Sequence, residues 1–146
     1  MIKNVLILGG YGFLGTNIIK FVDAHMRDAY QFIVFDKFDH HMGDVKCESI
    51  VKTYAGDFSD AELIERIFLE NHIDLIIHAL STTVPVNSAN ARYDVETNLL
   101  PTLDVLALMV KYNVKDIVYI KNSNRKTPKK QQKSRFHEKT ALTLCS

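Results

Sequence analysis

Three glycines at three-residue spacing separate an apolar run from a helical pattern near the start of the chain. The apolar run covers residues 5–8, the glycines are Gly9, Gly12 and Gly15, and an amphipathic pattern follows over 16–27. In such a turn Gly9 adopts a positive φ, Gly12 lets the backbone approach a pyrophosphate, and Gly15 lets the helix pack closely on the strand. The free N–H groups and the positive end of the helix dipole would hold the diphosphate without a lysine. This distinguishes the loop from a Walker A motif, in which Lys and Ser or Thr follow the last glycine.

An acidic residue stands where this kind of site needs one. Asp36 follows a second strand pattern over 31–35, and it lies about 20 residues after Gly15, the spacing of a dinucleotide-binding fingerprint. A carboxylate there can accept hydrogen bonds from both hydroxyls of an adenosine ribose, and it would repel a 2′-phosphate. The sequence therefore favours NAD over NADP. Lys37 could accommodate a phosphate, although a solvated loop lysine is the preferred interpretation.

Length and composition indicate one domain. The chain has 146 residues, of which 47% are hydrophobic and 24% charged, enough to bury one core. No run is long enough to cross a membrane and the amino terminus is too short for a signal peptide, so we expect a cytoplasmic protein without a membrane partner. Cys47 and Cys145 lack metal-ligand spacing, and the adjacent His40 and His41 are interpreted as exposed, so no metal site is expected.

The charge is divided unevenly along the chain. Residues 1–120 contain ten Lys or Arg against sixteen Asp or Glu, whereas 121–146 contain eight against one. We expect 1–120 to form the NAD-binding domain and 121–146 to be a basic, polar, poorly ordered loop or tail. Such a tail could attract nucleic acid, but Phe136 is its only aromatic side chain, so nucleic acid is not the expected partner.

Strand and helix patterns alternate through the first part of the chain, which predicts an α/β fold. The alternation is typical of a Rossmann-type, doubly wound parallel sheet. Right-handed crossovers give the strand order 3-2-1-4-5, with a ligand crevice at the carboxyl ends of the first and fourth strands. We expect the sheet to end after the fifth strand. The expected strands cover 1–8, 31–35, 51–54, 73–80 and 116–120.

Three helical segments, besides the one expected over 16–27, can be placed between these strands. A short helix is expected over 44–50, and a second helix begins after Ser59, the predicted N-cap, with Glu62 completing a capping box. A long helical pattern over 88–112 contains Pro101. Because proline removes a helical hydrogen bond, we expect a kink there, or a break with Pro101 in the first turn of a second segment.

Taken together, these motifs resemble the extended short-chain dehydrogenase/reductase family, in its nucleotide-sugar epimerase and dehydratase branch. The likeness spans residues 1–120. It rests on the glycine loop, Asp36, Gly56-Asp57-Phe58, Ile77-His78-Ala79 and Asn98. The resemblance implies NAD as the cofactor and a nucleotide sugar as the substrate of the full-length family.

The resemblance also implies which residues hold the cofactor. Under the pyrophosphate it places Tyr11, Gly12, Phe13 and Leu14. Around the adenosine it places Asp36, Asp57 and Phe58. Beside the nicotinamide-side ribose it places His78, Ala79, Leu80 and Ser81, with Asn98 steadying the loop after the fourth strand. Two of these have alternatives: Asp57 could cap the next helix, and His78 taken alone would be interpreted as a buried core histidine.

The chemistry of the family needs residues that this chain does not contain. A sugar carbon transfers a hydride to NAD with the help of a tyrosinate from Tyr-x-x-x-Lys, whose lysine lowers the tyrosine pKa. None of the six tyrosines here is followed four places later by lysine. Ser123 stands where the family has its catalytic serine, but an isolated serine in a polar loop is more often just loop.

Two possible functions follow from the presence of the cofactor-binding residues and the absence of the catalytic pair. We expect the NAD-binding portion of an epimerase- or dehydratase-like protein that stops short of the catalytic pair and is inactive alone. The alternative is a non-catalytic, NAD-responsive regulatory or binding module with a basic tail. In the family the 88–112 helix pairs in a dimer bundle, so Leu99, Leu103 and Leu106 predict a homo-oligomer through this helix.

Overall fold

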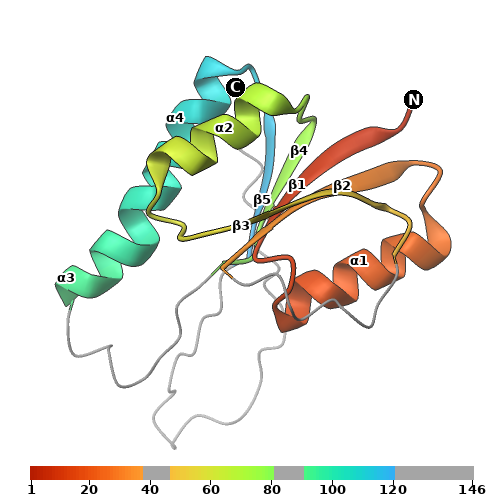
Figure 1. The fold of residues 1–146 in the computed structure, drawn as a ribbon, viewed down its shortest axis with the longest axis horizontal. Coiled ribbons are helices and arrows are strands. Elements are labelled where there is room, and N and C mark those ends of the chain that lie inside the picture. Colours follow the sequence, from red (N-terminus) through yellow and green to blue (C-terminus); the bar gives the residue numbers. More distant parts are fainter. Residues whose placement is uncertain (38–46, 81–90, 121–146) are drawn as a thin grey trace, which may run out of the picture.

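The computed structural model describes residues 1–37, 47–80 and 91–120, and its centre is a parallel sheet (Figure 1). Five strands stand in the order β3-β2-β1-β4-β5, which confirms the predicted topology. The strands are β1 (Lys3–Leu8), β2 (Tyr30–Asp36), β3 (Ile50–Ala55), β4 (Leu75–His78) and β5 (Asp116–Tyr119). Because all neighbours are parallel, the carboxyl ends of the strands lie at one edge.

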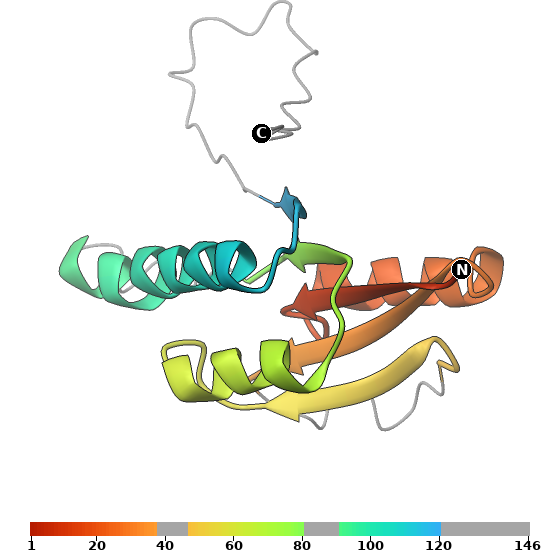
Figure 2. The ribbon, with the colours of Figure 1, turned by 90° about the horizontal axis from the view of Figure 1, so that it is seen from above.

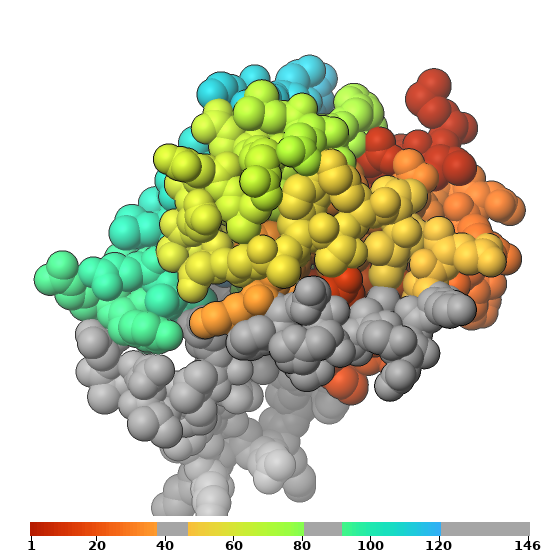
Figure 3. Space-filling model, in the orientation of Figure 1, coloured from red at the N-terminus to blue at the C-terminus, as the bar shows by residue number. Residues whose placement is uncertain are grey.

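Helices cover both faces of the sheet, as a doubly wound fold requires (Figure 2). The helix α1 (Phe13–His25) lies on one face, and α2 (Ala61–Glu70) and α4 (Leu100–Lys111) lie on the other. A short α3 (Ala91–Asp94) leads toward α4. In the space-filling view, α2 and β3 form much of the front face and α3 extends beyond them (Figure 3). None of the helices in the described ranges could cross a membrane.

The side chains of alternate strand residues pack into two separate hydrophobic cores, one on each face of the sheet. Val5 and Ile7 of β1 pack toward Ile19 of α1, whereas Leu6 and Leu8 pack into the larger core under α2 and α4. Each of these four strand residues is at most 1% exposed. A strand buried on both faces needs apolar residues at every position, which explains the unbroken apolar run of β1.

The start of α2 differs from the prediction. The N-cap is Asp60, whose side chain accepts a hydrogen bond from the Leu63 N–H at 3.1 Å. The predicted cap, Ser59, was wrong: its N–H and hydroxyl both donate to Asp57 Oδ1, at 2.9 and 2.7 Å. Asp and Ser are both good caps, so residue type alone did not separate the two neighbours.

The helix expected over 44–50 is also corrected. Residues 44–46 lie outside the described ranges, residues 48–49 form a turn, and Ile50 already belongs to β3. The Ser49 N–H donates to Asp23 Oδ1 of α1 at 2.7 Å. This contact between distant segments holds the turn before β3, and a local helical pattern does not reveal it.

Pro101 lies in the first turn of α4, the position predicted for it in a second helical segment. The chain does not leave the helix there, because a π-helical turn, Val95–Leu99, connects α3 to α4. The Leu100 N–H bonds the Val95 carbonyl, five residues back. One expectation for this helix was wrong: Leu106, predicted to contribute to an oligomer surface, is half-buried and packs against the core.

Candidate functional site

The β1–α1 loop brings the ends of β1 and β4 together at the carboxyl edge. Gly9 has φ +83°, and a Cβ there would lie 3.0 Å from the Leu80 nitrogen and 3.1 Å from the Ala79 carbonyl carbon. The Ala79 N–H donates to the Leu8 carbonyl at 2.9 Å. Gly9 is therefore required both by its backbone angle and by the close approach of β4.

Two further glycines are required by packing inside the protein. A Cβ at Gly15 would lie 2.4 Å from the Gly9 carbonyl oxygen, so α1 could not start so close to the loop. A Cβ at Gly10 would lie 2.6 Å from a methyl carbon of Val34 on β2. These distances are shorter than any ordinary carbon contact, so both positions need glycine for the fold itself.

Gly12 is different, because nothing in the described residues requires a glycine there. Its φ and ψ are −71° and 172°, which any residue can adopt. A Cβ would lie 3.4 Å from the Gly9 carbonyl oxygen, an ordinary contact, and the residue is exposed. The missing side chain leaves the backbone open to a molecule outside the fold.

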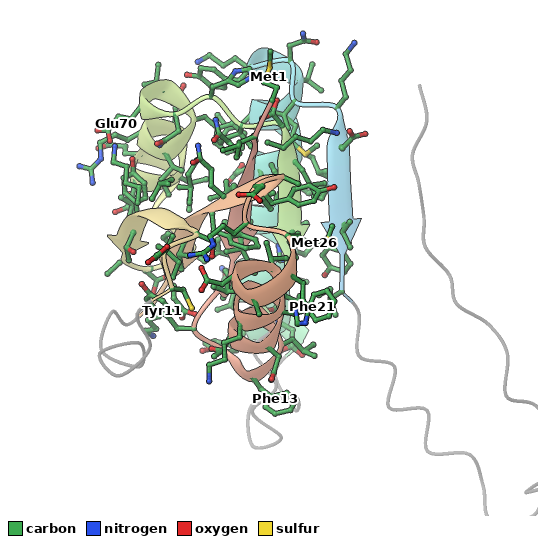
Figure 4. The ribbon with its side chains drawn as sticks, turned by 90° about the vertical axis from the view of Figure 1, so that its right-hand side faces the viewer. Met1, Tyr11, Phe13, Phe21, Met26 and Glu70 are labelled. Carbon is green, nitrogen blue, oxygen red and sulfur yellow. The ribbon has the colours of Figure 1, made fainter. Side chains whose placement is uncertain are left out.

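The first turn of α1 offers hydrogen-bond donors beside Gly12. Gly12 is the N-cap and provides no capping side chain. Within the described residues, the N–H groups of Phe13, Leu14 and Gly15 have no acceptor. Together with the positive end of the helix dipole, such N–H groups attract an anion. Figure 4 shows Tyr11 and Phe13 at the end of the molecule opposite Met1.

Asp36 ties the end of β2 to this loop. Its Oδ2 accepts a hydrogen bond from the Tyr11 N–H at 2.9 Å, and its Oδ1 accepts one from the Lys37 N–H at 2.7 Å. A carboxylate can accept about four hydrogen bonds, so two acceptor positions remain for a ligand. The carboxylate is directed toward the loop.

Asp57 and Phe58 follow β3 at the same edge. Both hydrogen bonds from Ser59 use Asp57 Oδ1, and they hold the pKa of this carboxyl below its usual range. Oδ2 accepts no bond from the described residues. The Phe58 ring is half-buried, 6.2 Å from the Phe35 ring and 5.3 Å from the His78 ring, so most of Phe58 is used in packing.

His78, the last residue of β4, is buried with only 1% of its surface exposed. Its ring packs between Phe58 and Tyr119, whose ring centre lies 4.8 Å away. Burial lowers the pKa of the imidazole from 6.5 to about 4, so His78 is neutral near pH 7. The half-buried Ala79 and Leu80 lie nearer the loop, where their backbones contact Gly9.

Asn98 lies in the π turn, and its carbonyl accepts a hydrogen bond from the Thr102 hydroxyl at 2.6 Å. π turns inside helices occur frequently at functional sites. The predicted site residues Ser81 and Ser123 lie outside the described ranges. The structure thus brings the glycine loop, Asp36, Asp57 and the end of β4 to one edge of the sheet.

Two threonines contact site residues without having been predicted. Thr53 of β3 lies 3.0 Å from the Tyr11 hydroxyl, and Thr102 lies 3.1 Å from His78 Nε2, measured from the threonine oxygen in each case. Thr102 could have been suspected, because it is polar and falls on the buried stripe of its helix with Val105 and Met109. No local pattern indicates Thr53.

The sequence matches a known family over most of its length. The profile of the NAD dependent epimerase/dehydratase family matches residues 5–143. The chain belongs to this family. Its relatives in the epimerase/dehydratase family include a dTDP-D-glucose 4,6-dehydratase from Dictyostelium discoideum, 32% identical over 125 residues, which are 82% of this chain and 29% of that protein. A UDP-glucose 4-epimerase from Halalkalibacterium halodurans is 29% identical over 116 residues, 79% of this chain and 33% of that protein.

Solved structures of epimerases share the same architecture. The UDP-glucose 4-epimerase of Bifidobacterium longum, in complex with NAD⁺ and UDP, superimposes with a TM-score of 0.68 and 30% identity. The match covers 80% of this chain and 36% of that one. This member of the epimerase/dehydratase family therefore spans about a third of the length of the relatives it matches.

Proposed function

We propose that the chain binds NAD at the β1–α1 loop and serves as the NAD-binding part of a nucleotide-sugar epimerase or dehydratase. Membership of the epimerase/dehydratase family supports the cofactor class. The observation that carries the proposal concerns Gly12. No contact among the described residues explains why this position has no side chain. A pyrophosphate approaching the backbone at this point would explain it.

The pyrophosphate, the adenosine ribose and the adenine of NAD would each have a hydrogen-bonding group of the chain to bind them. The N–H groups of Phe13, Leu14 and Gly15 would bind the pyrophosphate, and the two remaining acceptor positions of Asp36 would bind the adenosine diol. Asp57 Oδ2 would accept a hydrogen bond from the exocyclic amine of adenine. NADP would place its 2′-phosphate against the Asp36 carboxylate, so we expect NAD to be preferred.

Epimerisation or dehydration of a nucleotide sugar would need catalytic side chains that this sequence does not contain. Bound NAD would accept a hydride from a sugar carbon, but the sequence contains no Tyr-x-x-x-Lys pair to remove the hydroxyl proton. We therefore expect no epimerase or dehydratase turnover from this chain by itself. The absence of this pair also fits a non-catalytic NAD-responsive module, which would bind NAD but no nucleotide sugar.

Isothermal titration calorimetry with NAD and then NADP tests the proposal. We expect NAD to bind with a Kd on the order of micromolar, which corresponds to about −8 kcal/mol. NADP should bind at least roughly tenfold more weakly, a difference of about 1.4 kcal/mol. No binding of either nucleotide at millimolar concentration would overturn the proposal, and tighter binding of NADP would overturn the role of Asp36.

A matched pair of glycine substitutions separates binding from folding. Gly12→Ala places its Cβ in ordinary contact, so we expect normal thermal stability and loss of NAD binding by roughly tenfold or more. Gly15→Ala places its Cβ 2.4 Å from the Gly9 carbonyl oxygen and should lower the melting temperature. If Gly12→Ala bound NAD like the unmodified chain, the Gly12 argument would be wrong.

A further inference from the structure

A chain of two hydrogen bonds connects the end of β4 with the π turn before α4. His78 Nε2 lies 3.1 Å from the Thr102 hydroxyl oxygen, which lies 2.6 Å from the carbonyl oxygen of Asn98. Both hydrogen bonds are partly buried, and His78 is 1% exposed. The connection is therefore internal to the fold.

The geometry determines which nitrogen of His78 carries the proton. A carbonyl oxygen can only accept, so the single hydroxyl proton of Thr102 is donated to Asn98. The hydroxyl can then only accept from His78, and Nε2 must carry a hydrogen. In a neutral imidazole this leaves Nδ1 as a bare acceptor, and Nδ1 is buried without a hydrogen-bond partner among the described residues.

The chain of bonds reaches toward the proposed cofactor site. β4 and β5 are parallel, so the connecting α4 runs back against the strands and begins at their carboxyl edge. Thr102 is level with His78, and Asn98 lies one turn earlier in the helix, farther beyond the end of β4. This is the edge at which Gly9 contacts Ala79 and Leu80.

The helix is irregular at this point. Pro101 provides no N–H, and the π turn ends at Leu99, two residues before it. The Thr102 hydroxyl gives the Asn98 carbonyl a donor in this turn, and His78 fixes the orientation of that hydroxyl. Two backbone segments far apart in sequence are held in one arrangement.

We infer that His78 acts through Thr102 as a positioning residue, setting the π turn and with it Asn98 at the nicotinamide side of the site. This inference rests on the proposed function. It differs from the role implied by the family resemblance, in which His78 itself runs beside the ribose. In this role the buried imidazole does not contact the cofactor. Its protonated Nε2 donates to Thr102 and so connects β4 with α4.

Substitutions at Thr102 test the positioning role. Thr102→Val keeps the shape of the side chain and removes both hydrogen bonds, so NAD binding should weaken roughly tenfold, about one hydrogen bond's worth of affinity. Thr102→Ser keeps the hydroxyl, so its affinity for NAD should stay within about twofold of that of the unmodified chain. This change is smaller than the loss of one hydrogen bond would cause. Calorimetry measures the affinities, and circular dichroism checks the fold.

Tyr112 provides the control, because it lies at the opposite end of α4 from the π turn. Its hydroxyl donates to Glu65 Oε1 at 3.2 Å. Tyr112→Phe removes this bond and should leave NAD affinity nearly unchanged. If Thr102→Val bound NAD like the unmodified chain, or weakened binding no more than Tyr112→Phe, the positioning role would be overturned.

A nuclear magnetic resonance measurement tests the hydrogen-bond chain without any variant. Two-bond ¹⁵N correlations of the His78 ring in the unmodified chain should show a protonated Nε2 and a bare Nδ1. A protonated Nδ1 would overturn the inference even if NAD binds. If the unmodified chain bound no NAD, the proposed function and the positioning role would both fail, while the ring spectrum would still decide the tautomer.

Discussion

Gly9 and Gly15 are glycines for different physical reasons. The roles predicted for Gly9 and Gly15, a positive φ and close packing, agree with the distances in the loop. The need for glycine at Gly10 was not predicted, because it depends on a Val34 methyl group that reaches the loop only through the register of β1 and β2. Sequence spacing identifies a turn, whereas contacts between strands require the fold.

His78 should make the stability of the chain depend on pH. Its pKa is about 4 in the folded chain and 6.5 when unfolded, so the unfolded state binds a proton that the native state rejects. This costs no stability above pH 6.5, and an increasing amount as the pH falls from 6.5 to about 4. Between pH 7 and pH 5 we expect a loss of about 2 kcal/mol in the free energy of unfolding, measured with urea.

His78→Gln separates this effect from other titrations. Glutamine keeps an N–H for Thr102 but does not titrate, so the variant should be less sensitive to pH in this window. An equal slope in both proteins between pH 5 and pH 6.5 would show that His78 is not the group responsible.

At the scale of elements, the alternation of patterns was sufficient to predict the strand order. Right-handed crossovers leave few ways to arrange five parallel strands. Element ends were less predictable, because Ser59 and Asp60 are adjacent and both suited to capping. The π turn at Val95–Leu99 could not be foreseen, since the proline predicts only an irregularity.

The cap of α2 can be tested by comparing two alanine variants. Asp60→Ala removes the bond to the Leu63 N–H and should cost about 1 kcal/mol of stability. Ser59→Ala, at the position that the sequence favoured, removes only an exposed bond to Asp57 and should cost less than about 0.5 kcal/mol. Urea unfolding measures both, and equal losses would contradict the assignment of Asp60.

At the scale of the whole molecule, one side of α4 carries apolar side chains in contact with solvent. Leu99 and Leu103 are each 50% exposed and Val110 is 84% exposed. Their spacing places them on one stripe of the helix. On the adjacent β5, Val118 and Tyr119 are also about half exposed. Apolar stripes of this kind are typical of interaction surfaces.

We expect the chain to self-associate through this stripe. Sedimentation velocity should give a mass above the 16.7 kDa of one chain, and Leu103→Glu should restore a monomer. Phe21→Glu is the control, because Phe21 is 58% exposed on α1, across the sheet. A monomeric unmodified chain at about 100 μM, an easily populated range for weak dimers, would contradict the expectation.

The glycine loop is held in shape by β2 before any nucleotide arrives. The N–H groups of Gly9 and Gly10 donate to the Phe35 carbonyl, and that of Tyr11 donates to Asp36. The entropy of ordering the loop is therefore lost when the chain folds, so the proposed binding of a dinucleotide would not have to order it. Substitutions of buried β2 side chains that displace the Phe35 carbonyl should for this reason weaken the proposed cofactor binding, although these side chains do not themselves contact the ligand.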